Sequence, residues 1–69
     1  MSAVTVSVNG RSTSVQRGST IAELVKQLGL MANAVVVEFN GEPLLREQFS
    51  TTDLEPGDAV EIAHMVGGG

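Results

Sequence analysis

The sequence predicts an α+β domain, with a mixed four- to five-stranded sheet and one helix packed across one face of that sheet. Several short segments alternate apolar and polar residues, which is the period of a half-buried strand. One segment, residues 20–28, instead carries its apolar residues at helical spacing. The chain has 69 residues, which is enough for one small domain with a thin core.

Composition and charge exclude several classes of protein. The chain is 42% apolar and 17% charged, which suits a globular fold. The absence of cysteine excludes disulfides, thiolate catalysis and cysteine-based zinc sites, and it fits a reducing cytoplasm. The net charge is −4 and the basic residues are scattered, so we expect a basic partner protein and no nucleic acid.

We also expect no membrane association and no secretory signal. Residues 1–4 lack a charged stretch followed by an apolar one, which a signal peptide would require. The longest apolar run in the middle of the chain, residues 34–37, is far too short to span a bilayer. Together with the lack of cysteine, these features lead us to expect a cytoplasmic protein.

The first predicted element is a β-hairpin. Val4, Val6 and Val8 alternate with polar residues, which indicates a strand with one buried face. Asn9 and Gly10 follow, and both tolerate the positive φ that a type I′ turn requires, so we interpret them as turn residues only. The return strand, residues 11–16, is polar apart from Thr13 and Val15, which we expect to face inward.

A helix follows the hairpin. Thr20 and Glu23 form a T-x-x-E capping box at its start. Gly29 stands where a left-handed residue ends a helix. One apolar stripe, predicted to cover the sheet, consists of Ile21, Leu24, Val25 and Leu28.

The second half of the chain predicts three further strands. Residues 35–39 alternate as a strand, and a turn follows at residues 40–43. We expect Pro43 to end any pairing at its own amide, which leaves only a short edge strand at residues 44–45. Residues 46–53 are expected to hold a short helical turn, with Phe49 and Leu54 in the core. The last strand should span residues 59–66, beside the first strand at the centre of the sheet.

Catalytic groups are scarce. His64 is the single histidine, and we expect it to be an ordinary strand residue and not a catalytic or metal-binding one. The eight carboxylates are spread along the chain, and no pair has the burial context that would suit acid–base catalysis. The sequence therefore predicts no catalytic residue, no metal site and no bound cofactor.

The glycine tail is the one unusual feature. We divide the chain into a folded domain, residues 1–66, and a flexible tail, residues 67–69. Glycine lacks a side chain and adopts any backbone geometry, so Gly67 and Gly68 can thread a narrow channel in another protein. That channel would receive the terminal carboxylate of Gly69. A bare glycine end taken alone could equally be a frayed terminus.

The order and spacing of these elements resemble those of the ubiquitin-like β-grasp sulfur carriers, the ThiS/MoaD family, and most closely its thiamine-biosynthesis branch. The segments that carry the resemblance are VNG (8–10), TIAELV with Leu28 (20–28), VEFNGE (37–42), REQF (46–49), LEPGD (54–58), VEI (60–62) and VGGG (66–69). They span almost the whole chain. Phe49 stands where the family often has a tryptophan, which is a conservative departure.

The resemblance implies a β-grasp fold and a carrier that is itself not an enzyme. An E1-like adenylyltransferase (ThiF-type) would use ATP to adenylate the carboxylate of Gly69. A sulfur donor protein would convert the adenylate to a thiocarboxylate, and a thiazole synthase (ThiG-type) would take the sulfur. Partners would dock on the sheet face away from the helix, where Val36, Ala63 and Met65, with Val66 after them, form a modest apolar patch.

Two alternatives stay open. A sibling carrier of the same fold would serve molybdopterin or cysteine synthesis, because the chemistry of the tail is common to all these carriers. A protein of another class would be a β-grasp module that only binds partners, or a modifier conjugated to lysines. The patch residues Val36, Ala63 and Met65 could equally be scattered surface apolarity.

Overall fold

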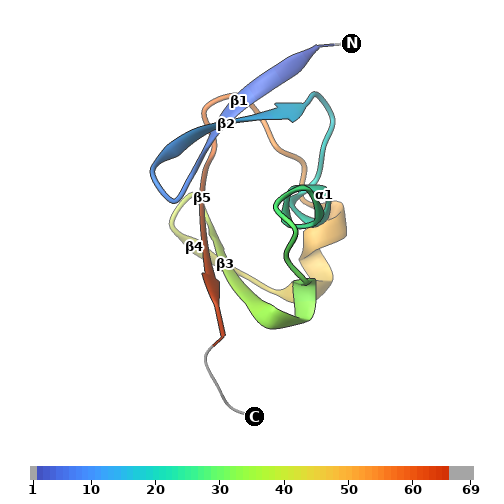
Figure 1. Ribbon diagram of the computed structural model, residues 1–69, viewed down its shortest axis with the longest axis vertical. Helices are drawn as coiled ribbons and strands as arrows, with labels where there is room; N and C mark the ends of the chain where they lie inside the picture. Colours follow the sequence, from blue (N-terminus) through green and yellow to red (C-terminus); the bar gives the residue numbers. More distant parts are fainter. Residues whose placement is uncertain (1, 66–69) are drawn as a thin grey trace.

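The computed structural model describes residues 2–65 and shows one five-stranded mixed sheet with helix α1 across one face (Figure 1). In chain order the elements are β1 (Ala3–Val8), β2 (Arg11–Gln16), α1 (Ile21–Gln27), the 3₁₀ turn η1 (Ala32–Ala34), β3 (Val35–Phe39), β4 (Glu42–Leu44), the 3₁₀ helix η2 (Arg46–Thr51) and β5 (Ala59–His64). Among these described residues, no helix is long and apolar enough to cross a membrane. The predicted fold class is confirmed.

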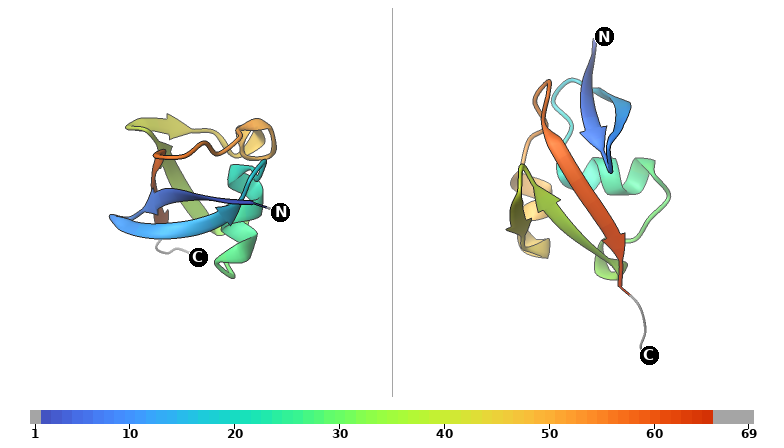
Figure 2. Two further views of the ribbon diagram at one scale, coloured as in Figure 1. Left: turned by 90° about the horizontal axis from the view of Figure 1, so that it is seen from above. Right: turned by 90° about the vertical axis from the view of Figure 1, so that its left-hand side faces the viewer.

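The strand order places β5 at the centre of the sheet, in the order β2-β1-β5-β3-β4. β1 and β5 run parallel, and every other neighbouring pair is antiparallel. The predicted neighbourhood of the first and last strands is therefore confirmed. Because β1 and β5 are parallel, the start of β1 and the end of β5 lie at opposite ends of the molecule (Figure 2).

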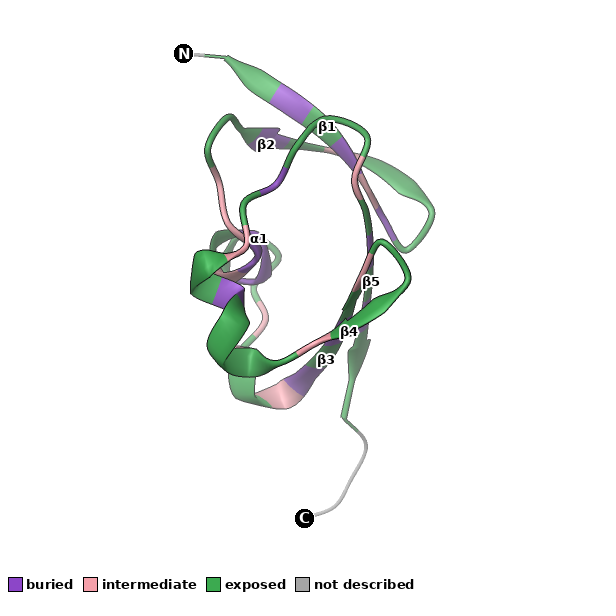
Figure 3. Cartoon of the chain, turned by 180° about the vertical axis from the view of Figure 1, so that it is seen from behind, coloured by how far each residue is buried: buried purple, intermediate pink, exposed green. Residues whose placement is uncertain are grey.

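The core lies between the sheet and α1, and Figure 3 shows its buried positions alternating along the strands. Valines at alternate positions of β1 face the helix, and so do Val35 and Val37 of β3. Among residues 2–65, no polar or charged side chain is buried. The thirteen core residues are Val4, Val6, Val8, Val15, Ile21, Leu24, Val25, Val35, Val37, Phe49, Leu54, Val60 and Ile62.

The predicted boundaries of α1 are confirmed at both ends. At its start the Thr20 hydroxyl accepts from the Glu23 amide at 3.2 Å, and the Glu23 carboxylate accepts from the Thr20 amide at 2.9 Å. At its end Gly29 has φ +77° and its amide bonds to the Lys26 carbonyl, while the Leu30 amide bonds to the Val25 carbonyl. This pair of bonds is the Schellman arrangement, which allows Leu30 to turn back onto the core.

The position predicted for Leu28 was wrong. We expected it in the buried stripe of the helix, but it is 39% exposed. The helix ends at Gln27, so Leu28 is the C-cap residue, and the chain leaves the helix there. Leu30, which follows the turn, packs against the core in its place.

The limits of β4 also differ from the prediction, which placed an edge strand at residues 44–45. The observed strand is Glu42–Leu44, with Pro43 paired opposite Glu38. Proline is tolerated here because β4 is the edge strand, and the side on which proline lacks a donor has no further strand to pair with. Leu45 lies outside the strand and is 60% exposed.

The remaining expectations on the second half are largely confirmed. Residues 46–51 form the short helical turn η2, and Phe49 and Leu54 are buried in the core. The last strand ends at His64, earlier than the predicted residue 66, because His64 pairs with Val35, the first residue of β3. Thr13 and Val15 were both expected to face inward. Thr13 is half-buried and Val15 is buried.

Candidate functional site

The candidate site begins on β5, the strand that leads into the glycine tail. Gly67, Gly68 and Gly69, which we predict to carry the chemistry, lie outside the described residues, as does Val66. What the structure describes is the support for that tail. β5 is hydrogen-bonded to β1 on one side and to β3 on the other, so it is the central strand of the sheet.

The far end of β5 remains tied to the domain just beyond its last paired residue. The Met65 amide donates to the carbonyl of Ala34 at 2.9 Å, so η1 holds the chain where β5 ends. Met65 itself is 55% exposed. The direction in which the chain leaves the sheet is therefore set by backbone contacts up to Met65.

Asn9 fixes β5 from the side of β1. Its side-chain amide donates to the Ile62 carbonyl at 3.0 Å, and its side-chain oxygen accepts from the Ile62 amide at 2.8 Å. This pair of bonds extends the β1–β5 pairing beyond the end of β1, where the hairpin turn carries the backbone away. From the sequence we interpreted Asn9 as a turn residue only, and this bond pair to Ile62 was missed. The only signal in the sequence was a side-chain amide, which carries both an acceptor and N–H donors, at the turn.

Asn40 fixes the other end of β5 from the side of β3. Its backbone amide donates to the Ala59 carbonyl at 2.7 Å, and its side-chain oxygen accepts from the Ala59 amide at 2.8 Å. The Asn40 side-chain nitrogen also donates to Asp58 at 3.2 Å. The asparagines of both Asn-Gly turns thus lie beside β5, and both hold it through its backbone.

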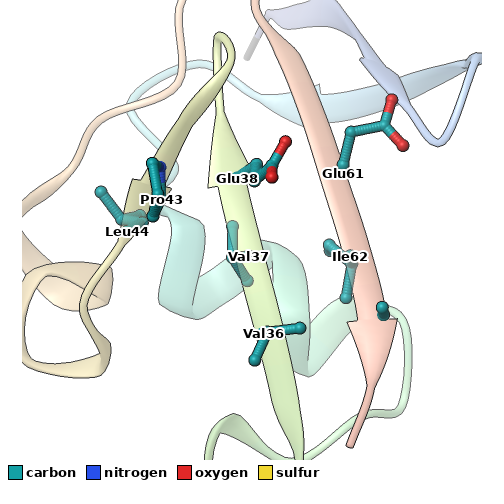
Figure 4. A pocket seen from close by; sticks show the side chains of 8 residues that line it. Val36, Val37, Glu38, Pro43, Leu44, Glu61 and Ile62 are labelled. Carbon is teal, nitrogen blue, oxygen red and sulfur yellow. The ribbon is translucent and has the colours of Figure 1, made fainter.

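The sheet face away from α1 holds two of the predicted docking residues, Val36 and Ala63. Val36 and Ala63 lie directly opposite each other on β3 and β5, and both are exposed, Val36 by 53%. The next outward pair along these strands is Glu38 and Glu61, also directly opposite and exposed. Pro43 lies beside Glu38 on β4. Figure 4 shows this face, where these side chains line a shallow hollow of about 550 Å³.

His64 lies at the end of β5, opposite Val35, and is exposed. Within residues 2–65, no three histidine or carboxylate side chains gather in a way that could hold a metal ion. The arrangement is suited to presenting a segment to another protein, because it combines a rigid supporting strand with an exposed, partly apolar face.

Comparison with known proteins agrees with this geometry. The model of the ThiS family matches residues 3–69. The sulfur carrier protein ThiS of Bacillus subtilis (strain 168) is 33% identical over 63 residues, which cover 90% of this chain and 96% of that protein. A thiazole synthase of Magnetococcus marinus is 30% identical over 64 residues, or 93% of this chain, but this chain spans only 20% of that protein's length.

Solved structures show the same relationship. The crystal structure of a thiamine biosynthesis protein (ThiS) from Geobacter metallireducens is 39% identical and superposes with a TM-score of 0.81, covering 96% of this chain and all (100%) of that one. The solution structure of a thiamine biosynthesis protein from the same organism gives a TM-score of 0.78 at 39% identity and covers 96% of this chain and 88% of that one. The matches span both the sheet and the helix, so we conclude that this chain belongs to the ThiS family.

Proposed function

We propose that this chain is a sulfur carrier for thiamine thiazole biosynthesis and acts as a protein substrate for its partners. The observation that carries the proposal is the match of the ThiS family model across residues 3–69, which includes the glycine tail. The relatives named above are a sulfur carrier and a thiazole synthase, which favours thiamine over molybdopterin or cysteine synthesis. The chain itself would supply no catalytic group.

The proposed chemistry uses the carboxylate of Gly69. A carboxylate oxygen attacks the α-phosphorus of ATP on an adenylating partner, and pyrophosphate leaves. A sulfide-level sulfur nucleophile from a donor protein then attacks the acyl carbon, and AMP leaves, which produces the thiocarboxylate. Because no oxidation state changes in these two steps, neither requires an oxidant or a reductant. ATP is used by the partner and is not a cofactor of this chain.

The different roles expected of the folded domain and of the glycine tail support this proposal. Glycines at 67 and 68 present no side chain to a narrow channel, so the carboxylate of Gly69 can enter a partner's active site. β5, held by Asn9 and Asn40, provides a fixed base for that segment. A partner that grips the folded domain can therefore aim the tail with little loss of conformational freedom in the domain itself.

Intact-mass spectrometry tests the proposal directly. In cells that contain the adenylating enzyme and the sulfur donor, a fraction of the chain should be heavier by one oxygen-to-sulfur replacement, located at Gly69. The matched control is a chain that ends at Gly68, which should stay unmodified. If only the carboxylate is ever found on the full chain under these conditions, the carrier function is refuted.

The shortened chain also separates chemistry from folding. Among the described residues, every core member lies between Val4 and Ile62, so removing Gly69 should leave the thermal unfolding midpoint unchanged. ATP–pyrophosphate exchange with the adenylating enzyme should be lost at the same time. A large fall in the unfolding midpoint would show that the tail contributes to the fold.

A further inference from the structure

The sheet face away from α1 carries an unusual charge distribution. Within the described strands, only two charged residues occupy positions on this face, Glu38 and Glu61, and both are carboxylates. The chain's basic residues lie elsewhere. Arg11 is opposite the buried Val8, Lys26 is in α1 and Arg46 begins η2. The Arg17 side chain donates to Ser2 at 3.0 Å.

Glu38 and Glu61 are directly opposite residues of the β3–β5 pair. Residues directly opposite in an antiparallel pair have Cβ atoms about 5 Å apart, and like charges at that spacing destabilise the sheet. No basic residue occupies a described strand position on this face to neutralise them. The pair therefore opposes the stability of the free domain.

An exposed apolar surface adjoins the two glutamates. Val36 and Ala63 form the next outward row, toward the end of β5, and Pro43 flanks Glu38 on the edge strand. These five residues, which we call the acid-pair patch, line most of the hollow shown in Figure 4. An exposed apolar surface beside an unneutralised pair of charges is complementary to a side chain that has both an apolar part and a cationic group.

We propose that the acid-pair patch binds an arginine of a partner protein, inserted between Glu38 and Glu61, next to an apolar side chain seated on Val36 and Ala63. This inference rests on the proposed function, because the partner is one that acts on the tail. A guanidinium has five donors in a plane and can bridge two carboxylates, whereas an ammonium is a more strongly hydrated point charge. The partner would lie beside the strand that leads into the tail.

Charge argues against other occupants of the patch. A second copy of this chain, docked by the same face, would bring two further carboxylates against Glu38 and Glu61. Nucleic acid would bring phosphates, which the same pair repels. A partner with a cation at this point removes the like-charge repulsion when it binds, so the unfavourable pair in the free domain becomes favourable in the complex.

Binding of an arginine by Glu38 and Glu61 predicts opposite effects on stability and on partner binding, which a purely structural role of the pair would not produce. Replacing both carboxylates with amides, as E38Q/E61Q, should raise the thermal unfolding midpoint of the free chain, because the repulsion is removed. The same variant should bind the partner more weakly. The matched control is Glu47→Gln in η2, an exposed carboxylate on another element. It should change neither quantity.

A small probe tests the patch without any enzyme. The isotope-labelled full chain is titrated with N-acetyl-leucyl-arginine amide and, separately, with the same peptide carrying uncharged citrulline. We expect NMR shift changes centred on Val36, Glu38, Glu61 and Ala63 with the arginine peptide only. The dissociation constant should rise about tenfold in E38Q/E61Q and stay unchanged in E47Q, as the loss of charge-assisted hydrogen bonds implies.

A second measurement uses the adenylating enzyme. In ATP–pyrophosphate exchange, the KM for the chain should rise about tenfold in E38Q/E61Q with kcat preserved, because the carboxylates bind and do not react. If the full chain supports no exchange, the proposed function fails. The peptide titration then still shows whether the acid-pair patch binds arginine. Any of four results would overturn the inference. In E38Q/E61Q these are a wild-type KM or an unfolding midpoint below that of wild type. In the wild-type chain they are equal NMR shifts with the citrulline peptide or concentration-dependent self-association through the patch.

Discussion

At the scale of single residues, Asn9 and Asn40 do more than form turns. Both have positive φ, 52° and 51°, and each is followed by a glycine of positive φ, which is the geometry of a type I′ turn. A side-chain amide carries one carbonyl acceptor and an amide donor, so it can replace a peptide group in a ladder. Asn9 pairs in this way with Ile62.

Asn9→Gly isolates the contribution of that side chain. Glycine adopts the same positive φ without strain, so the turn is kept while both hydrogen bonds to Ile62 are lost. We expect the free energy of unfolding to fall by about 1–2 kcal/mol, since a partly buried backbone donor and acceptor lose their partners. Urea denaturation with an unchanged m-value measures this loss.

Asn9→Asp is the companion variant. Its carboxylate can still accept from the Ile62 amide, but it offers no donor to the Ile62 carbonyl. We expect the Asn9→Asp chain to be destabilised as well. If the Asn9→Gly chain were as stable as wild type, the side-chain bonds of Asn9 would contribute nothing to stability.

At the scale of elements, α1 depends on its ends and its packing. Seven residues are too few for an isolated helix to be stable in water. Its start is joined to the segment after η2, where the Ile21 amide bonds to the Thr52 carbonyl and the Leu54 amide to the Ser19 carbonyl. The capping box between Thr20 and Glu23 completes this junction.

Thr20→Ala tests the cap. The variant removes the oxygen that accepts from the Glu23 amide, and loss of such a cap costs about 1 kcal/mol. Thr20→Ser keeps the hydroxyl and should retain most of the stability. Thermal unfolding monitored by circular dichroism compares the two, and equal midpoints for Thr20→Ala and Thr20→Ser would show that the hydroxyl is dispensable.

At the scale of the whole molecule, stability depends on one thin core beneath a single helix. A domain of this size rarely gains more than about 3–5 kcal/mol from its core. Ile21, Leu24 and Val60 are fully buried at its centre, at 0% exposure. Single large-to-small changes there therefore remove a large share of the total stability.

Leu24→Ala and Leu28→Ala form a matched pair on the same helical segment. Leu24 is 0% exposed, and its truncation should cost about 2–5 kcal/mol, enough to unfold a substantial fraction of the chain. Leu28 is 39% exposed, and we expect a loss below about 1 kcal/mol. Similar losses in the two variants would contradict the core described above.

The sequence by itself determined the class of fold, most element limits and the direction of the search for function. Alternating valines, one capped helical stripe and two Asn-Gly turns were enough, because each depends on contacts between residues close in the chain. It also identified Val36 and Ala63 as outward residues, since strand alternation fixes their face. The tail of residues 67–69 stays a prediction made from the sequence.

Only the tertiary structure decided which distant residues meet. Leu28 was misplaced because the Schellman turn, and not the helical period, directs the chain at that point. Asn9 reaches Ile62, and Glu38 faces Glu61, through strand order and register. Both depend on pairings between segments far apart in the chain, and no local pattern of residues encodes such a register on its own.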